Sequence, residues 1–236
     1  MNETKKYLAV VFDLFGTLVH NFSYQAYNDS LSQMASALLL SSDDFRQVWF
    51  ATSKERNSGI AQSCEGDIRN VCRALGMLPE DSQVQLAVQR RLDYIRSVMT
   101  PQPDAIEVLV RLKEEGFGIG LLSNCTHEIP TVWSETPFAP LIDVAIFSCS
   151  VGMMKPNPRI YELTAERLEV RPEECLFIGD GGSQELSGAL SVGMLPVLTR
   201  PDADSMEPHL RNREQWDGLT ISSLMDILAV LKEIGD

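Results

Sequence analysis

The chain has 236 residues, of which 44% are hydrophobic, and a formal net charge of −13. The apolar content is typical of a globular protein, and the length suits one large domain or a core domain with a smaller insert. The acidic charge argues against a nucleic-acid partner and gives no attraction to anionic membranes. An anionic substrate therefore needs local positive charge or a metal ion to hold it.

Five cysteines are scattered along the chain without a CxxC pair. A structural zinc site is therefore not expected, and free thiols in a reducing compartment are the simplest interpretation. The polar first residues do not look like a secretory signal, and no apolar run has the length of a membrane span. We expect a cytoplasmic protein, monomeric or homodimeric, with no membrane partner.

The first predicted element is a buried strand at residues 7–12. This apolar, β-branched run leads directly into Asp13, and a Gly16-Thr17 turn follows. Such a run is typical of a parallel sheet, whose carboxyl edge is where ligands bind in open α/β folds. Asp13 can act there as a nucleophile or a metal ligand, or it can simply cap the next turn. The stretch alone leaves both interpretations open.

The next 80 residues or so have a different pattern, with apolar residues at helical spacing and no strand signal. Ser42 or Asp43 is suited to begin one helix, and Gly76 to end another. We predict an all-helical insert over residues 20–100, the size of a small helical bundle. Its helices are expected at 25–40, 42–53, 66–75 and 82–99.

Beyond residue 100, short apolar strands alternate with amphipathic helices. The alternation predicts parallel βαβ units, so the fold class is α/β with a doubly wound parallel sheet. The core domain comprises residues 1–19 and 101–236, and the insert leaves it beside Asp13, where a lid would lie. Strands are expected at 117–123, 143–148, 175–179 and 195–199, and helices at 104–115, 158–168, 185–192 and 222–234.

Four groups of polar residues follow the predicted strands in order. They are Asp13, Ser123 with Asn124, Lys155, and Asp180 with Glu185. The loops that carry them converge on one edge if the sheet forms, although Lys155 lies seven residues past Ser148. Each residue also has an ordinary structural interpretation, as a helix cap, a loop lysine, a turn residue or first-turn helix charge. One shared site explains the ordered set more simply than four coincidences.

The chemistry of such a cluster follows from its charges. Asp13 and Asp180 repel each other, and a bridging Mg²⁺, which favours carboxylates and phosphate oxygens, relieves the repulsion. Lys155 offsets the remaining negative charge, and Ser123 can donate to a phosphoryl oxygen. Phosphoryl transfer depends mainly on such positioning and charge stabilisation, with Asp13 as the candidate nucleophile.

These motifs resemble those of the haloacid dehalogenase-like (HAD) hydrolase superfamily over nearly the whole chain. The motifs are FDLFGTL at 12–18, LLSN at 121–124, KPNP at 155–158 and FIGDGGSQE at 177–185. Each is weakly specific alone, whereas the ordered set is strongly specific. The resemblance implies a Rossmann-like core, and the helical insert is similar to the superfamily's C1-type cap, which usually closes over small soluble substrates.

The resemblance also implies roles for individual residues. Asp13 and Lys155 would be catalytic, and Glu185 would orient metal-bound water. Thr17, Ser123 and Asn124 would bind the substrate, a small molecule. The Mg²⁺ cofactor would be held by Asp13, Asp180 and the Phe15 carbonyl.

One departure from the superfamily's phosphatases concerns Phe15, which stands where they carry a general acid/base Asp. A phenyl ring cannot protonate a leaving group, and loss of that function typically costs about 10²–10⁴-fold in rate. The superfamily's dehalogenases have an aromatic residue there, but they lack the Gly-Asp metal signature that Gly179-Asp180 resembles. We therefore predict a Mg²⁺-dependent phosphatase; the alternatives are a 2-haloacid dehalogenase, or a weakened enzyme acting as a binding protein.

Side chains of the insert are candidates for contact with the substrate. Arg46, Arg56 and Arg69 could each meet a substrate anion, and Arg56, beside Gly59, has the best loop placement. Most arginines of a helical bundle lie on its surface, so surface positions are the alternative. Trp49 and Phe50 are expected in the core of the insert rather than in a substrate wall.

Overall fold

The apolar runs of the sequence form a parallel sheet in a computed structural model, which describes residues 6–199 and 213–235. The strand order is β3-β2-β1-β4-β5-β6, and every neighbouring pair is parallel. The predicted α/β class with a doubly wound sheet is therefore confirmed. The strands are β1 (Ala9–Phe12), β2 (Gly118–Ser123), β3 (Val144–Phe147), β4 (Cys175–Gly179), β5 (Leu195–Thr199) and β6 (Thr220–Ile221).

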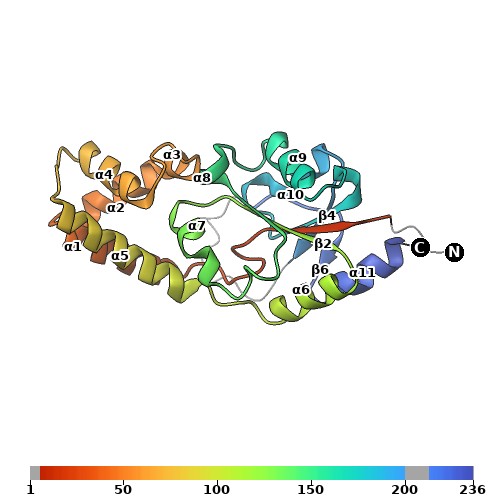
Figure 1. Ribbon diagram of the computed structural model, residues 1–236. Helices are drawn as coiled ribbons and strands as arrows, with labels where there is room; N and C mark the ends of the chain where they lie inside the picture. The colour runs from red at the N-terminus through yellow and green to blue at the C-terminus, as the bar shows by residue number, and fades with distance from the viewer. Residues whose placement is uncertain (1–5, 200–212, 236) are drawn as a thin grey trace.

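Strand β1 shows why these runs are continuously apolar. Successive side chains point to opposite faces of a sheet, and all four of its residues are fully buried. Val10 and Phe12 join one hydrophobic cluster, and Ala9 and Val11 join the other. Helices cover both faces, so neither face of the strand tolerates polar residues. In Figure 1, α6 (Ala105–Glu114) and α11 (Asp226–Gly235) lie on one side of the sheet, and α9 (Pro158–Arg167) and α10 (Glu185–Ser191) on the other.

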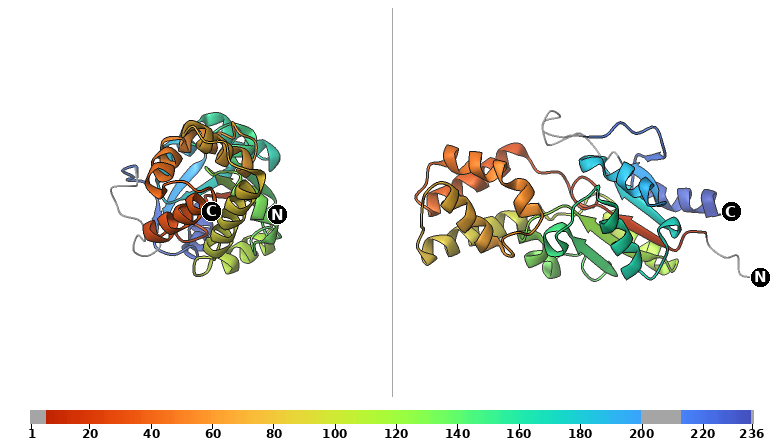
Figure 2. Two further views of the ribbon diagram at one scale, coloured as in Figure 1. Left: turned by 90° about the vertical axis from the view of Figure 1, so that its left-hand side faces the viewer. Right: turned by 90° about the horizontal axis from the view of Figure 1, so that it is seen from above.

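The segment between β1 and α6 is helical, as the spacing predicts. It has its own hydrophobic cluster around Phe45 and Trp49, and Figures 1 and 2 show it at one end of an elongated molecule. We call it the insert; that it is a separate cap domain over residues 20–100 stays a prediction. Its helices are α1 (Tyr24–Ala37), α2 (Ser42–Ala51), α3 (Ser53–Asn57), α4 (Cys64–Ala74) and α5 (Asp81–Val98).

The start and stop signals of the insert are only partly as expected. Gly76 has a φ of +73° just past α4, as expected of a helix stop. The cap of α2 is Ser41, whose hydroxyl accepts from the Asp44 N–H, rather than Ser42 or Asp43. The helix expected at 42–53 corresponds to α2, and the short α3 was not expected. Among the described residues, no helix is long and apolar enough to span a membrane.

The strand order reverses at β1, which is the position where ligands bind in open α/β sheets. Phe12, the last residue of β1, is in register with Leu121 of β2 and Ile178 of β4. The Asp13 N–H continues this ladder by donating to the Ile178 carbonyl at 2.8 Å. The residues that follow β1, β2 and β4 therefore meet at one edge of the sheet.

Two buried polar pairs join the insert to the rest of the fold. Arg91 of α5 donates to Glu128 of α7 (Glu128–Val132) at 2.5 Å, with side chains only 3% and 1% exposed. Asp67 of α4 contacts the His127 ring nitrogen at 3.0 Å. Burial opposes ionisation of Glu128, but the Arg91 charge and hydrogen bonding hold its pKa below the usual range. Removing either partner of this pair therefore leaves the other as a buried charge without compensation.

The first prediction concerns this ion pair. We expect Arg91→Met to lower the free energy of unfolding by about 3–5 kcal/mol, because it leaves Glu128 buried without a counter-charge. The double variant R91M/E128Q should recover much of the loss. Urea denaturation measures both effects.

The Arg96–Glu135 pair is a matched control, because Arg96 also lies on α5 and also reaches the α/β part of the chain, but both side chains are exposed. Arg96→Met should change the stability far less than Arg91→Met, since exposed pairs contribute little. Equal losses for the two single variants would contradict the prediction.

The second prediction is a pH dependence caused by Asp67. Burial raises the pKa of Asp67 from 3.8 to about 6, although the hydrogen bond from His127 opposes the shift. Between these pH values the folded state binds more protons than the unfolded state, so stability falls as pH rises. Relative to the Asp67→Asn variant, the native free energy of unfolding should decrease from about pH 4 to about pH 6 and then level off. Chemical denaturation across this range measures it, and a constant difference would refute it.

Candidate active site

Asp13 follows β1 at the centre of the edge and is buried. The Lys155 ammonium lies 2.5 Å from one of its carboxylate oxygens. The fully buried Thr17 donates its hydroxyl to the other oxygen at 3.4 Å. These contacts hold the Asp13 carboxylate in one orientation. Thr17, which the family resemblance assigned to substrate binding, contacts the candidate nucleophile in this structure.

Lys155 bridges two carboxylates, because its ammonium also lies 2.5 Å from Glu185. Burial disfavours the charged form, but the charges of Asp13 and Glu185 raise the pKa of Lys155 above its usual range. The lysine is therefore a fixed positive charge in the site. Of the site residues predicted from the sequence, Lys155 lies furthest beyond the end of its strand, yet the structure places it against Asp13.

Asn124 explains how the long loop before Lys155 reaches Asp13. Its side-chain oxygen accepts from the Lys155 N–H at 2.8 Å, and its amide nitrogen donates to the Lys155 carbonyl at 3.1 Å. The two hydrogen bonds fasten the loop after β3 to the end of β2. Asn124 is expected from the family resemblance to bind substrate, whereas its observed contacts favour a role in positioning the lysine.

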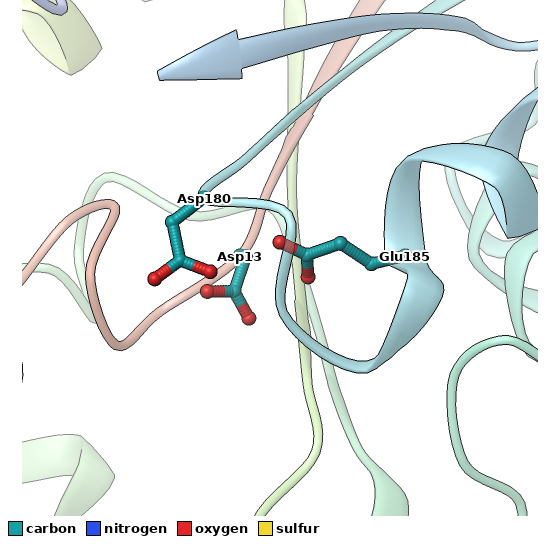
Figure 3. Close-up of side chains that lie close together, drawn as sticks. All are labelled: Asp13, Asp180 and Glu185. Carbon is teal, nitrogen blue, oxygen red and sulfur yellow. The ribbon is translucent and has the colours of Figure 1, made fainter. Parts of the chain in front are cut away.

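Three carboxylates form what we call the acidic cluster: Asp13, Asp180 and Glu185. Asp180 directly follows β4, and Glu185 begins α10. One oxygen of each lies within 4.8 Å of the others, and Figure 3 shows the three side chains converging. Gly16 allows this approach, because its φ is +87° and a Cβ there would lie 2.1 Å from an Asp180 oxygen. The turn after Asp13 thus packs directly onto the second carboxylate.

Backbone groups fix the two carboxylates that follow β4. The Gly181 N–H donates to Glu185 at 3.1 Å, and the Gly182 N–H donates to Asp180 at 2.9 Å. Gly179 must lack a side chain, since a Cβ there would lie 2.3 Å from a Glu185 oxygen. Within this motif, Gly179 is therefore the glycine that permits the close approach of the Glu185 carboxylate.

The electrostatics of the acidic cluster favour a bound cation. Burial raises the pKa of Asp13, and burial together with the Asp13 charge raises the pKa of Glu185 to about 8. The cations that the structure places at the cluster are Lys155 and Arg213, whose guanidinium is 3.8 Å from Asp180. Buried carboxylates that crowd one another are the hard oxygen ligands of Mg²⁺, so the donor set fits this ion. The Phe15 carbonyl as a further ligand stays a prediction.

Ser123 ends β2, the strand beside β1. It is 1% exposed and lies two residues beyond Leu121, the register partner of Phe12. The serine thus reaches the same edge as Asp13, as expected. Its predicted contact with a phosphoryl group stays a prediction.

A cavity of about 600 Å³ opens between this edge and the insert. Phe15 forms part of its wall, and the Phe15 ring lies 4.2 Å from that of Phe22, centroid to centroid. The side chain at position 15 therefore contributes an apolar surface. Residues after β1, β2 and β4 line one side (Phe15, Asn124, Thr126 and Ser183), and helices of the insert line the other (Tyr27, Phe50, Arg56 and Arg91).

The structure distinguishes the arginine candidates of the insert. Arg46 pairs with Asp43 and Arg69 with Glu65 and Asp81, whereas Arg56 lines the cavity.

The two aromatic residues of α2 also differ. Trp49 lies in the core of the insert, as expected. The same expectation for Phe50 is wrong, because this side chain is 44% exposed and lines the cavity.

Arg91 is a cavity residue that the sequence reasoning missed. It lies on the buried face of α5 together with Val84, Ala87 and Ile95. A charged residue on an otherwise apolar helical stripe was the signal that could have identified it. Its partner Glu128 lies in a connection with no periodic pattern, so sequence reasoning had no basis for the pairing.

The comparisons with known proteins agree with this geometry. A family model described as haloacid dehalogenase-like hydrolase matches residues 7–193. The glyceraldehyde 3-phosphate phosphatase of Methanopyrus kandleri is 28% identical over 96% of this chain and 97% of its own length. The (S)-2-haloacid dehalogenase H-109 of Pseudomonas putida is 27% identical over 78% of this chain and 81% of its own length.

Solved structures show the same fold. A 2-haloacid dehalogenase from Pseudomonas syringae has a TM-score of 0.70 and 19% identity, covering 97% of this chain and 99% of that one. A HAD phosphatase from Thermococcus onnurineus has a TM-score of 0.66 and 21% identity, covering 95% and 97%. The ordered motifs, the sheet and the family match agree: this chain belongs to the haloacid dehalogenase-like hydrolases.

Proposed function

We propose that this hydrolase is a Mg²⁺-dependent phosphatase acting on a small phosphorylated metabolite through an aspartyl-phosphate intermediate. The observation that carries the proposal is the acidic cluster at the strand ends, with Lys155 against Asp13. A site that only positioned a nucleophile would not need three buried carboxylates in one place. The phosphatase relative that spans nearly the whole chain is consistent with it.

Asp13, Asp180 and the Phe15 carbonyl would hold Mg²⁺, with Glu185 orienting its bound water. When bound, the ion neutralises charge between the phosphoryl group and the carboxylates and polarises the phosphoryl oxygen. The protein's own part is to keep these oxygens together, through the glycine contacts described above.

Asp13 performs the bond-forming step in this proposal. Its carboxylate attacks phosphorus, the alcohol oxygen departs, and water then hydrolyses the aspartyl-phosphate to regenerate the carboxylate. Lys155 favours the ionised form of Asp13 against the effect of burial and offsets the charge on the phosphoryl oxygens, and Ser123 donates to one of them. Thr17 and Asn124 hold the nucleophile and the lysine in place.

Phe15 determines which leaving groups react well. No carboxylate stands at this position to protonate the departing oxygen, so the oxygen must leave as an anion or take its proton from water. The reaction therefore depends strongly on how well the leaving group stabilises negative charge.

A 2-haloacid dehalogenase is the second candidate, and the aromatic wall favours it. Phe15 and Phe22 present apolar rings beside the edge of the sheet, and a halide leaves as an anion without a general acid. In that reaction Asp13 attacks carbon and forms an ester. We rank it second, because a metal-free reaction gives the acidic cluster no role.

The third prediction tests the phosphatase proposal directly. The protein should hydrolyse para-nitrophenyl phosphate with Mg²⁺ and lose that turnover in EDTA. Asp13→Asn should lower kcat at least 10³-fold while the circular dichroism spectrum and Tm stay near native, since the change removes the nucleophile and keeps its shape. Full metal-dependent activity in this variant would exclude Asp13 as the nucleophile.

The same preparations separate the two candidates. Chloride release from 2-chloropropionate that persists in EDTA and disappears in Asp13→Asn would establish the dehalogenase instead. Binding of Mg²⁺ without turnover of either substrate would favour the weakened enzyme.

The fourth prediction follows from Phe15. Because no acid assists departure, kcat/KM should fall at least tenfold from para-nitrophenyl phosphate to phenyl phosphate, whose leaving group is more basic. Initial rates with both esters give the ratio of the two kcat/KM values. This ratio depends only on the steps up to and including phosphoryl transfer to Asp13. Equal kcat/KM values would show that another group supplies the proton.

A further inference from the structure

Arg56 is a buried cation in the wall of the cavity. It is the last residue but one of the short helix α3 of the insert and is 4% exposed. Within the described ranges, 6–199 and 213–235, no salt bridge joins it to a carboxylate. Burying an isolated charge is unfavourable, so its position calls for a compensating group.

The existing contacts of Arg56 are with a neutral residue. One terminal nitrogen donates to the Trp49 carbonyl at 2.6 Å, and the guanidinium lies 3.7 Å from the centroid of the Trp49 ring. Its Nε has no hydrogen-bond partner among the described residues. Burial lowers the pKa of Arg56. The tryptophan therefore orients the guanidinium without neutralising it.

The two carboxylates whose charges favour the ionised form of Arg56 have partners of their own. Glu128 is paired with Arg91, and Asp67 contacts His127. Arg91, which also lines the cavity, has an Nη1 without a hydrogen-bond partner in the described part of the chain. Two guanidinium groups thus line one cavity, and each has one nitrogen that bonds no described residue.

The same cavity reaches the edge of the sheet. Asn124, which fastens the Lys155 loop, and Phe15, two residues after Asp13, line it on that side. Aromatic side chains line it from the other segments: Phe22, Tyr24, Tyr27 and Phe50. A single ligand can therefore meet the sheet edge, an apolar wall and the arginines at once.

Contacts with the residues that follow β3 hold the segment around Arg56 in place. Ser148, the residue after β3, donates to the Asn57 carbonyl at 2.7 Å. Gly59 has a φ of +72°, and a Cβ there would lie 1.8 Å from the Cys149 carbonyl oxygen. The guanidinium is thus held at a defined position relative to the strand ends.

We propose that the substrate is a small phosphomonoester that carries a second anionic group, a carboxylate or another phosphate, bound by Arg56 at the end of the cavity away from the scissile bond. A short apolar or aromatic body joins the two anions and lies against the aromatic walls. The proposal rests on the proposed function in one respect, that the reacting phosphate binds at Asp13.

Three activated esters test the proposal: para-nitrophenyl phosphate, its meta-carboxy derivative and its meta-phosphono derivative, which all release a nitrophenolate. The native protein should show a higher kcat/KM for an ester that carries the second anionic group than for para-nitrophenyl phosphate. Of the two substituted esters, the one with the higher kcat/KM identifies the second anion. Arg56→Met should reduce that preference about tenfold or more, as expected for hydrogen bonds to a charged group. Arg56→Lys should retain part of it.

The ratio of kcat/KM values does not depend on how much of each variant is folded, so a structural loss alone leaves it unchanged. Arg46→Met is the matched control, because Arg46 pairs with Asp43 within α2. Its ratio should equal the native one. An unchanged ratio in Arg56→Met would overturn the proposal.

A binding measurement keeps the proposal separate from catalysis. Calorimetric titration of the carboxy ester into Asp13→Asn and into the D13N/R56M double variant should show about tenfold weaker binding in the second. If the native protein turns over none of the esters and these two affinities differ, the phosphatase proposal fails and the anion site stands. Equal affinities would refute the anion site, whatever the turnover.

Discussion

The crowding of buried carboxylates around one lysine is the constraint on which the site depends. Asp13 and Glu185 share the Lys155 ammonium, and Asp180 lies within the same small volume. Like charges so close are stable only if cations or protons compensate them. The surrounding backbone is shaped by this requirement: Gly16 and Gly179 leave no room for a Cβ, and loop N–H groups donate to the carboxylates. The acidic cluster is therefore costly to build, which supports a role in binding a cation.

The strand order determines which of these groups need extra support. Asp13 and Asp180 follow neighbouring strands in register, so the sheet alone brings them together. Lys155 arrives from beyond β3, two strands from β1, and needs a separate fastening. The two hydrogen bonds from Asn124 supply it. A polar residue after a strand thus contributes here by holding a loop.

Periodicity predicted the sheet, most helices and the residues at the strand ends, because these depend on local patterns and on one topological rule. Periodicity did not predict the contacts between the insert and the rest of the fold. Arg91 and Glu128 are 37 residues apart, and Asp67 and His127 are 60 apart. Such pairs depend on how the helices pack against one another. The spacing of apolar residues along the chain carries no information about that packing. Phe50 shows the same limit, since its helical position fits either a core or a cavity wall.

The net charge of −13 gives the molecule no general attraction for an anionic substrate. Binding must then come from a few cations held where the substrate lies. Lys155 serves the reacting end, and its charge is fixed by two carboxylates. Arg56 differs, because Trp49 orients its guanidinium and no described carboxylate forms a salt bridge with it. A charge already neutralised by the protein stabilises a site, whereas one left open in a cavity selects a ligand. In the proposed function, the sheet edge determines the chemistry, and the insert determines which anion reaches it.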